Sequence, residues 1–190
     1  MRPIPLTLAL LIIMMLAAAA LSQQAPQREM QTGVKTSDEV YAAVAEVQVK
    51  PGVPGQGEEA VGTAIQDLLT QVADAGFTPL GSIQVAVVSP LPPPADGSMT
   101  LQIRIPIIEQ PTPEDLQPDA PLSIAKLAAT QVAYTYHKGP MQDVELSFAR
   151  LMQWVMAQNL PMAGAPFIII YGTPDPDPMK QVAELQVPVK

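Results

Sequence analysis

The sequence predicts an α+β fold built from a duplicated strand–helix–strand–strand unit, with a mainly antiparallel sheet, two helices on one face and a ligand groove on the other. Three observations predict it. Two stretches have the apolar spacing of amphipathic helices, alternating stretches typical of strands flank them, and the two halves share matching residues at a near-constant spacing. The chain has no cysteine, so the core must hold the fold without disulfides.

The first unit follows from periodicity alone. Its four elements are a strand, a helix and two further strands, at residues 40–50, 58–75, 81–88 and 101–107. Gly76 follows the helical stretch at the position where a C-terminal cap belongs. Turns rich in proline and glycine, at 51–57 and 90–98, separate the elements.

The second unit begins after a connector rich in Pro and Asp at 110–121. A strand ending at 134–137 leads to a turn at Gly139-Pro140 and a helix at 143–158. Four residues of the first unit match the second at a spacing of 83: Leu68, Leu69, Val72 and Gly81 match Leu151, Met152, Val155 and Gly164. Ile105-Pro106-Ile107 reappears as Val187-Pro188-Val189, one residue out of step. A long period seen twice favours duplication within one domain.

The N-terminal segment predicts export. Arg2 precedes an unbroken run of 14 apolar residues, Leu8 to Leu21, which ends in small residues at Ala20-Leu21-Ser22. This run is shorter than a membrane-spanning helix, although an uncleaved signal could still anchor the chain with its domain outside the cytoplasm. We therefore expect a signal peptide at 1–22, a polar linker at 23–38 and one domain at 39–190, in a periplasmic or secreted protein.

The charge balance limits the partners. Losing Arg2 with the signal leaves 9 of the 10 basic residues against 18 acidic ones, a net charge of −9, which repels phosphate backbones and anionic lipid. We therefore expect no nucleic-acid partner and, once the signal is cleaved, no stable membrane insertion. The oligomeric state is left open.

Side-chain alternation in the last strands predicts the site. Leu185, Val187 and Val189 must cover the helices, so Glu184 and Gln186 point to the other face. The spacing of 83 places Phe167, Ile169 and Tyr171 on that face as well. A helix-free face with aromatic residues and a carboxylate is typical of a ligand groove, although a solvent-facing Glu184 on an open sheet is the plain structural alternative.

Three other features favour structural roles. His137 is the only histidine, and without a second ligand nearby it predicts a capping or hydrogen-bonding residue and not a metal site. Asp175 and Asp177 lie in a Pro-rich hairpin loop that lacks the ligands and glycine of a calcium loop. Trp154 follows the helical spacing of the core, with a place in a pocket wall as the alternative. No metal or cofactor is expected.

Known catalytic motifs are missing from the sequence. It has no Gly-Xaa-Ser-Xaa-Gly elbow, no phosphate-binding Gly-Lys-Ser/Thr loop, no cysteine nucleophile and no His-Glu-Xaa-Xaa-His pair. Most enzyme classes are therefore unsupported.

Residues 40–190 resemble the GyrI-like small-molecule-binding domain, which is also the effector-binding domain of many AraC-type and MerR-type transcription regulators. The matching segments are 133–140, 148–155, Gly164-Ala165-Pro166 leading to Tyr171, and the ending 183–189. The resemblance implies a groove between the repeats that binds hydrophobic, often cationic or aromatic compounds. Glu184 would be its central polar residue, followed by Tyr171 and Phe167. We add Gln186, Tyr136 and Trp154 as further candidate ligand-binding residues. Met141-Gln142 departs from the family pattern, which has an aromatic and an acidic residue there.

Three functions remain open. The first is an exported module that binds an apolar, aromatic or cationic small molecule without turnover. The second is a hydrolase of small electrophilic compounds that uses Glu184 as base or nucleophile, since some relatives look like such enzymes. The third is a non-catalytic adaptor for a protein partner.

Overall fold

The computed structural model describes residues 31–50, 56–89, 97–172 and 177–190. The expected signal peptide, the linker up to residue 30 and Asp175 lie outside this part of the chain. The described elements, in chain order, are β1 (Thr32–Thr36), β2 (Val40–Val49), α2 (Gln56–Asp74), β3 (Ser82–Val87), β4 (Met99–Pro106), β5 (Ile124–Leu127), β6 (Gln131–Lys138), the 3-10 turn η2 (Met141–Asp143), α3 (Val144–Ala157), β7 (Phe167–Tyr171), the 3-10 turn η3 (Pro178–Lys180) and β8 (Val182–Pro188).

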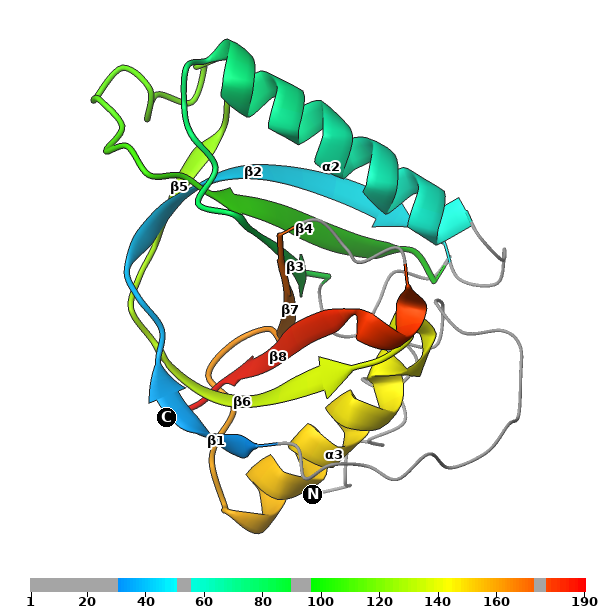
Figure 1. The fold of residues 1–190 in the computed structure, drawn as a ribbon. Coiled ribbons are helices and arrows are strands. Elements are labelled where there is room, and N and C mark those ends of the chain that lie inside the picture. Colours follow the sequence, from blue (N-terminus) through cyan, green and yellow to red (C-terminus); the bar gives the residue numbers. More distant parts are fainter. Residues whose placement is uncertain (1–30, 51–55, 90–96, 173–176) are drawn as a thin grey trace.

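The strands form one antiparallel sheet in the order β1-β6-β8-β7-β3-β4-β2-β5. The first unit, β2-α2-β3-β4, and the second, β6-α3-β7-β8, meet where β3 pairs with β7. The sheet curves strongly, and both helices lie on its outer side (Figure 1). The predicted α+β duplication with both helices on one face is confirmed.

Each helix covers its own hydrophobic cluster. Under α2, Leu68 and Val72 pack with Ile103 and Ile105 of β4. Under α3, the buried side chains include those of Phe148, Leu151, Val155, Leu185 and Val187. The strand residues in both clusters are the ones whose alternation predicted a face toward the helices. The two-residue period of β4 and β8 therefore determines which side chains point to the opposite, inner face of the sheet.

Gly76 ends α2 as expected. Its φ of +80° lies in the left-handed region, which glycine adopts without steric cost. The amide of Phe77 donates to the carbonyl of Val72 and that of Gly76 to Ala73, a pattern that satisfies the last carbonyls of a helix.

Two short strands correct the expected boundaries. Residues 32–36, expected in the polar linker 23–38, form β1 and pair with β6, while β5 follows the connector and pairs with β2. Each strand precedes one repeat and pairs with the other. Neither segment alternates long enough to predict a strand, because both are ordered by the edge of a partner far away in sequence.

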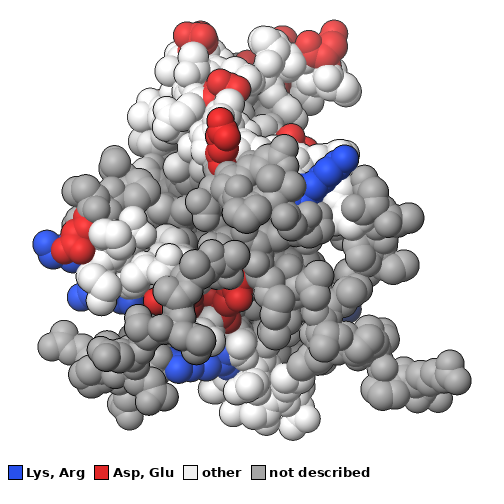
Figure 2. All heavy atoms as spheres, turned by 90° about the vertical axis from the view of Figure 1, so that its right-hand side faces the viewer, with Lys and Arg blue, Asp and Glu red and all other residues white. Residues whose placement is uncertain are grey.

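Acidic side chains gather over one part of the face that Figure 2 shows. Figure 2 shows acidic side chains at the top of the molecule, where α2 lies, with no Lys or Arg among them. Glu59, Asp67 and Asp74 belong to this helix, whose sequence holds no basic residue.

Among the helices that the structure describes, none has the length and apolar composition of a membrane span.

Candidate ligand-binding site

The inner face of the sheet carries the residues predicted for a groove. In the antiparallel pairing of β7 and β8, Phe167 lies opposite Gln186 and Ile169 opposite Glu184, so these side chains share one face. Across the next pair, Tyr136 of β6 lies opposite Glu184. The alternate residues Leu185 and Val187 point into the core beneath α3.

A cavity of about 690 Å³ opens on this face, and both repeats line it. Phe167, Ile169, Tyr171 and Gln186 contribute from the second repeat, and Arg104 contributes from β4 of the first. Its volume is in the range of sites for small organic molecules.

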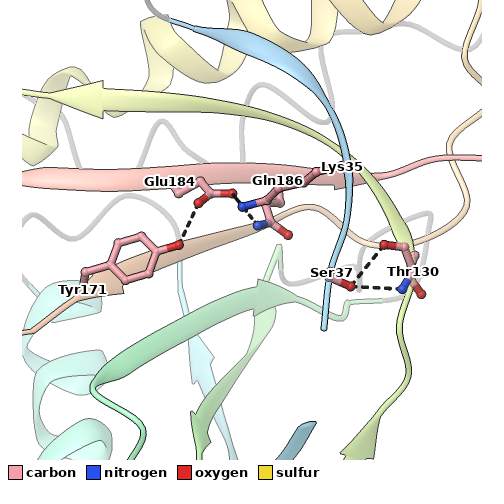
Figure 3. Close-up of polar contacts among 6 residues, drawn as sticks. All are labelled: Lys35, Ser37, Thr130, Tyr171, Glu184 and Gln186. Carbon is pink, nitrogen blue, oxygen red and sulfur yellow. Dashed lines mark hydrogen bonds and ion pairs between the residues drawn. The ribbon is translucent and has the colours of Figure 1, made fainter. Parts of the chain in front are cut away.

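Two chain connections close one side of the cavity. Ser37, between β1 and β2, and Thr130, between β5 and β6, both line it. The amide and hydroxyl of Ser37 donate to the Thr130 carbonyl at 2.8 and 3.1 Å, and the Thr130 amide donates to the Ser37 hydroxyl at 3.0 Å (Figure 3). The connections that follow β1 and β5 are thereby joined to each other on the cavity wall.

Glu184 lies at the centre of a polar network and is fully buried. Its Oε2 accepts a hydrogen bond from the Tyr171 hydroxyl at 2.7 Å, and its Oε1 accepts one from Nε2 of Gln186 at 2.5 Å (Figure 3). Oε1 also forms an ion pair with Nζ of Lys35, at 2.6 Å. The solvent-facing alternative for Glu184 is therefore wrong.

These partners determine the ionisation of Glu184. Burial raises the pKa of a carboxyl, but hydrogen bonds from Lys35, Tyr171 and Gln186 and the charge of Lys35 together hold the pKa of Glu184 below its ordinary value. The group is an anion whose charge Lys35 already neutralises. Such a carboxylate is a weak base.

The tyrosines next to Glu184 keep their protons. Burial raises the pKa of Tyr171 well above its ordinary value, and the hydrogen bond to Glu184 and its negative charge add to the rise. The pKa of Tyr136 is also raised, first by burial and then by the charge of Glu184. Tyr171 is therefore a fixed donor to the carboxylate.

Sequence reasoning missed Lys35 and Arg104. Lys35 comes from β1, which was placed in the linker, and its Nζ also lies 5.0 Å from the centre of the Tyr134 ring. Arg104 lies over the Phe167 ring at 5.9 Å, its Nε donates to Oε1 of Gln102 at 2.7 Å, and burial lowers its pKa. The alternation of β4 could have placed Arg104 on the inner face, since Ile103 and Ile105 face the helix.

Three of the six predicted ligand-binding residues line the cavity: Phe167, Tyr171 and Gln186. Glu184 lies beneath its surface, behind its hydrogen-bond partners, and Tyr136 is not among the lining residues. Trp154 packs against the hydrophobic cluster of α3, on the other side of the sheet, so its alternative placement in the pocket wall is wrong. Its helical spacing with the core residues had favoured this outcome.

His137 has the structural role expected of it. The side chain is buried, its Nε2 lies 3.0 Å from the Pro140 carbonyl and its Nδ1 lies 2.9 Å from the Ser147 hydroxyl. Because a carbonyl only accepts, Nε2 carries a proton and donates to Pro140, while Nδ1 and the Ser147 hydroxyl share the second hydrogen bond. His137 thus ties β6 to α3.

Asp177 caps η3 by accepting from the amide of Met179 and pairs with Lys180 at 3.3 Å. Within the described ranges, no three metal-ligating side chains come together.

Comparisons with known proteins show the fold. No family model matches the sequence, and no curated protein matches it significantly. The structure is similar to the C-terminal domain of EcmrR, with a TM-score of 0.68 and 16% identity over 85% of this chain and 98% of that domain.

Two further solved structures share the arrangement. SAV2435 bound to tetraphenylphosphonium has a TM-score of 0.55 and 14% identity, over 85% of this chain and 94% of that one. A hydrolase from Listeria innocua has a TM-score of 0.55 and 15% identity, over 87% and 94%. These similarities support the GyrI-like fold that the sequence resemblance implied.

Proposed function

We propose that this protein is an exported small-molecule-binding protein that takes an apolar or aromatic compound into the cavity between its repeats. One observation carries the proposal. A cavity of about 690 Å³ has an aromatic and aliphatic wall, formed by Phe167 and Ile169, above the hydrogen-bonded network of Glu184. Apolar walls with a few fixed polar groups are typical of small-molecule sites.

The state of Glu184 favours binding without turnover. A general base needs an accessible carboxylate with a pKa near the working pH, whereas Glu184 is buried, holds three partners and has a lowered pKa. The same bonds fix its position, so it organises the polar floor through Tyr171 and Gln186, which reach the cavity surface. A cationic compound would have to compete with Lys35 for the charge of Glu184.

The similar structures support this proposal at the level of fold. SAV2435 was solved with tetraphenylphosphonium, a large aromatic ion, and the cavity of this chain has room for compounds of that class. Export is supported by Arg2 and the apolar run Leu8 to Leu21. The acidic charge argues against nucleic acid as a direct partner.

A hydrolase is the second candidate, because two of the similar structures are described as hydrolases from Listeria innocua. It would need Glu184 to leave its ion pair with Lys35 during each turnover. Incubation with small electrophilic compounds, followed by product analysis, separates the two. We expect no product; turnover that Glu184→Gln abolishes would establish the hydrolase.

Fluorescence titration with N-phenyl-1-naphthylamine, a neutral aromatic probe, tests binding. We expect saturable binding of one probe per chain. Phe167→Ala, which removes a cavity wall, should weaken binding at least about tenfold, since burial of an aromatic ring contributes about 1.5–3 kcal/mol and about 1.4 kcal/mol corresponds to tenfold.

Leu146→Ala is the matched control, because Leu146 is 60% exposed on α3. It should leave the affinity unchanged. Equal effects of the two substitutions, or no saturable binding by either variant or the parent, would contradict the proposal and favour an adaptor for a protein partner.

A further inference from the structure

The two repeats place equivalent polar pairs on the inner face. The spacing of 82 that matches Ile105-Pro106-Ile107 with Val187-Pro188-Val189 also matches Gln102 with Glu184 and Arg104 with Gln186. In each pair the second residue donates to the first: Arg104 Nε to Gln102, and Gln186 Nε2 to Glu184. Each repeat therefore contributes to the cavity lining the donor of one polar pair, Arg104 or Gln186.

The charges of these two pairs differ. In the second repeat, Glu184 is neutralised by Lys35 at 2.6 Å, so this side presents no net charge. In the first repeat, Arg104 lines the cavity and the described residues form no ion pair with it. Of its hydrogen-bonding groups only Nε has a partner within the described part of the chain, so the two terminal nitrogens are available to the cavity.

The other charged residues that line the cavity do not cancel Arg104. Asp38 is exposed, and solvent screens its charge. Lys126 forms its ion pair with Glu39, with both side chains about half exposed. Arg104 is thus a partly buried cation, fixed by Gln102 and by the face of Phe167.

The second repeat supplies an acceptor. The amide oxygen of Gln186 is buried and has no hydrogen-bond partner. Its orientation is set by Glu184, because a carboxylate needs the amide nitrogen as donor; Figure 3 shows the oxygen directed away from Glu184. An unpartnered buried acceptor that lines a cavity is suited to a donor on a ligand.

We propose that the cavity selects an aromatic compound that carries an acidic group, a carboxylate or sulfonate, bound by the terminal nitrogens of Arg104. Cationic compounds are disfavoured, because Lys35 already neutralises the charge of Glu184. The guanidinium fork matches two oxygens of such a group, and Phe167 supplies the surface for the ring. A hydroxyl or amine on the ligand donates to Gln186. This inference rests on the proposed function and specifies its ligand class.

Two probes with the same rings test this preference. N-phenyl-1-naphthylamine is neutral, and 8-anilinonaphthalene-1-sulfonate adds one sulfonate to the same skeleton. We expect the sulfonate to bind about tenfold more tightly, a difference of about 1.4 kcal/mol, because Arg104 forms charge-assisted hydrogen bonds with the sulfonate alone. Competition between the probes shows that they share one site.

Arg104→Gln places in the first repeat the residue that the second repeat already has at this position. It should remove the preference for the sulfonate, so that the two probes bind this variant with affinities within about twofold of each other. Arg104→Lys should retain part of it. The control is Arg150→Gln, which makes the same charge change on an exposed residue of α3 and should retain the full preference.

Lys35→Gln tests the role of Lys35. Without this counterion, tetraphenylphosphonium should displace the neutral probe at about tenfold lower concentration, because Glu184 then offers an uncompensated charge. Lys138→Gln, at an exposed position of β6, should have no such effect.

The outcomes separate the two proposals. Equal affinity for the two probes in the parent, or a sulfonate preference that survives Arg104→Gln, would overturn the anionic ligand class while leaving the binding function intact. Tighter binding of tetraphenylphosphonium than of the sulfonate by the parent protein would do the same. Failure of every probe to bind would overturn both.

Discussion

Glu184 shows how the neighbours of a single carboxylate determine its chemistry. Alternation along β8 was enough to place it on the inner face, but the same pattern fits a solvated residue, an exposed base or a buried anion. The contacts of Glu184 show that it is the buried anion: its carboxylate oxygens accept hydrogen bonds from Tyr171 and Gln186 and form an ion pair with Lys35. Glu184 therefore acts as an organiser of the cavity floor.

The depressed pKa of Glu184 predicts how its contribution to stability depends on pH. Because the folded-state pKa lies below the unfolded one, ionised Glu184 stabilises the fold above the ordinary glutamate pKa of about 4.3 and loses this effect as the pH falls through the lower folded value. At pH 7, Glu184→Gln should lower the free energy of unfolding by about 2–3 kcal/mol.

Urea denaturation of both proteins from pH 7 down to about pH 3 measures this difference. The loss should shrink on acidification. A constant difference across the range would show that the charge of Glu184 contributes nothing to the fold.

The residues of the site differ in how far the sequence could reveal them. Phe167, Tyr171 and Gln186 followed from two-residue alternation and the repeat spacing, since both place a side chain on a face. Lys35 did not, because its position depends on β1 pairing with a strand about a hundred residues later. The alternation of side chains within a segment does not reveal a pairing between strands so far apart in the sequence.

At the scale of elements, the long segments were predictable and the short edges were not. α2, α3 and the strands β2, β3, β4 and β6 carry their own periodicity, because each buries a regular face. β1 and β5 have five and four residues, and their order comes from the strands they pair with. They nevertheless lead into Ser37 and Thr130, whose hydrogen bonds join two connections on the cavity wall.

This connection predicts a measurable contribution. Ser37→Ala removes two side-chain hydrogen bonds to Thr130 and should lower the free energy of unfolding by about 1–2 kcal/mol. Ser123→Ala, which removes an exposed hydroxyl just before β5, should change it by less than about 0.5 kcal/mol. Equal changes in the free energy of unfolding for the two variants, measured by chemical denaturation, would mean that the Ser37–Thr130 hydrogen bonds do not stabilise the fold.

The core beneath α3 gives a second prediction at this scale. Leu151 is 1% exposed in this cluster, and Leu151→Ala should cost about 2–5 kcal/mol through lost burial and the remaining void. Leu146→Ala, five residues earlier on the exposed side, should be close to neutral. The urea midpoints of unfolding of the two variants give the comparison. A Leu151→Ala variant as stable as the parent would contradict the assigned helix face.

For the whole molecule, duplication explains why two equivalent polar pairs, one from each repeat, lie on the inner face and differ in charge. Equivalent positions of β4 and β8 carry Gln102 and Arg104 in one half, Glu184 and Gln186 in the other. The fold thereby presents a cation on one side and a neutralised anion on the other. This asymmetry arises from different side chains at equivalent positions of the two repeats.

The predicted signal also belongs to the whole molecule. Expressed from its first methionine in a bacterial host, the protein should reach the periplasm with a new N-terminus near Ala20 or Ser22, because the segment has the order of a secretory signal. Fractionation and intact mass measure this. An intact mass that includes residues 1–20, with the protein in the cytoplasm, would contradict export.

The central claim is that a small aromatic molecule occupies the cavity between the repeats, and photolabelling tests it most directly. Benzophenone-4-carboxylate, an aromatic acid that inserts into nearby C–H bonds on irradiation, should label the chain saturably, and N-phenyl-1-naphthylamine should suppress the labelling. Peptide mass spectrometry should place the label in the cavity-lining segments around Ala163–Tyr171 and Arg104–Pro106. Label on the outer faces of α2 and α3, or label that the neutral probe does not suppress, would contradict the account.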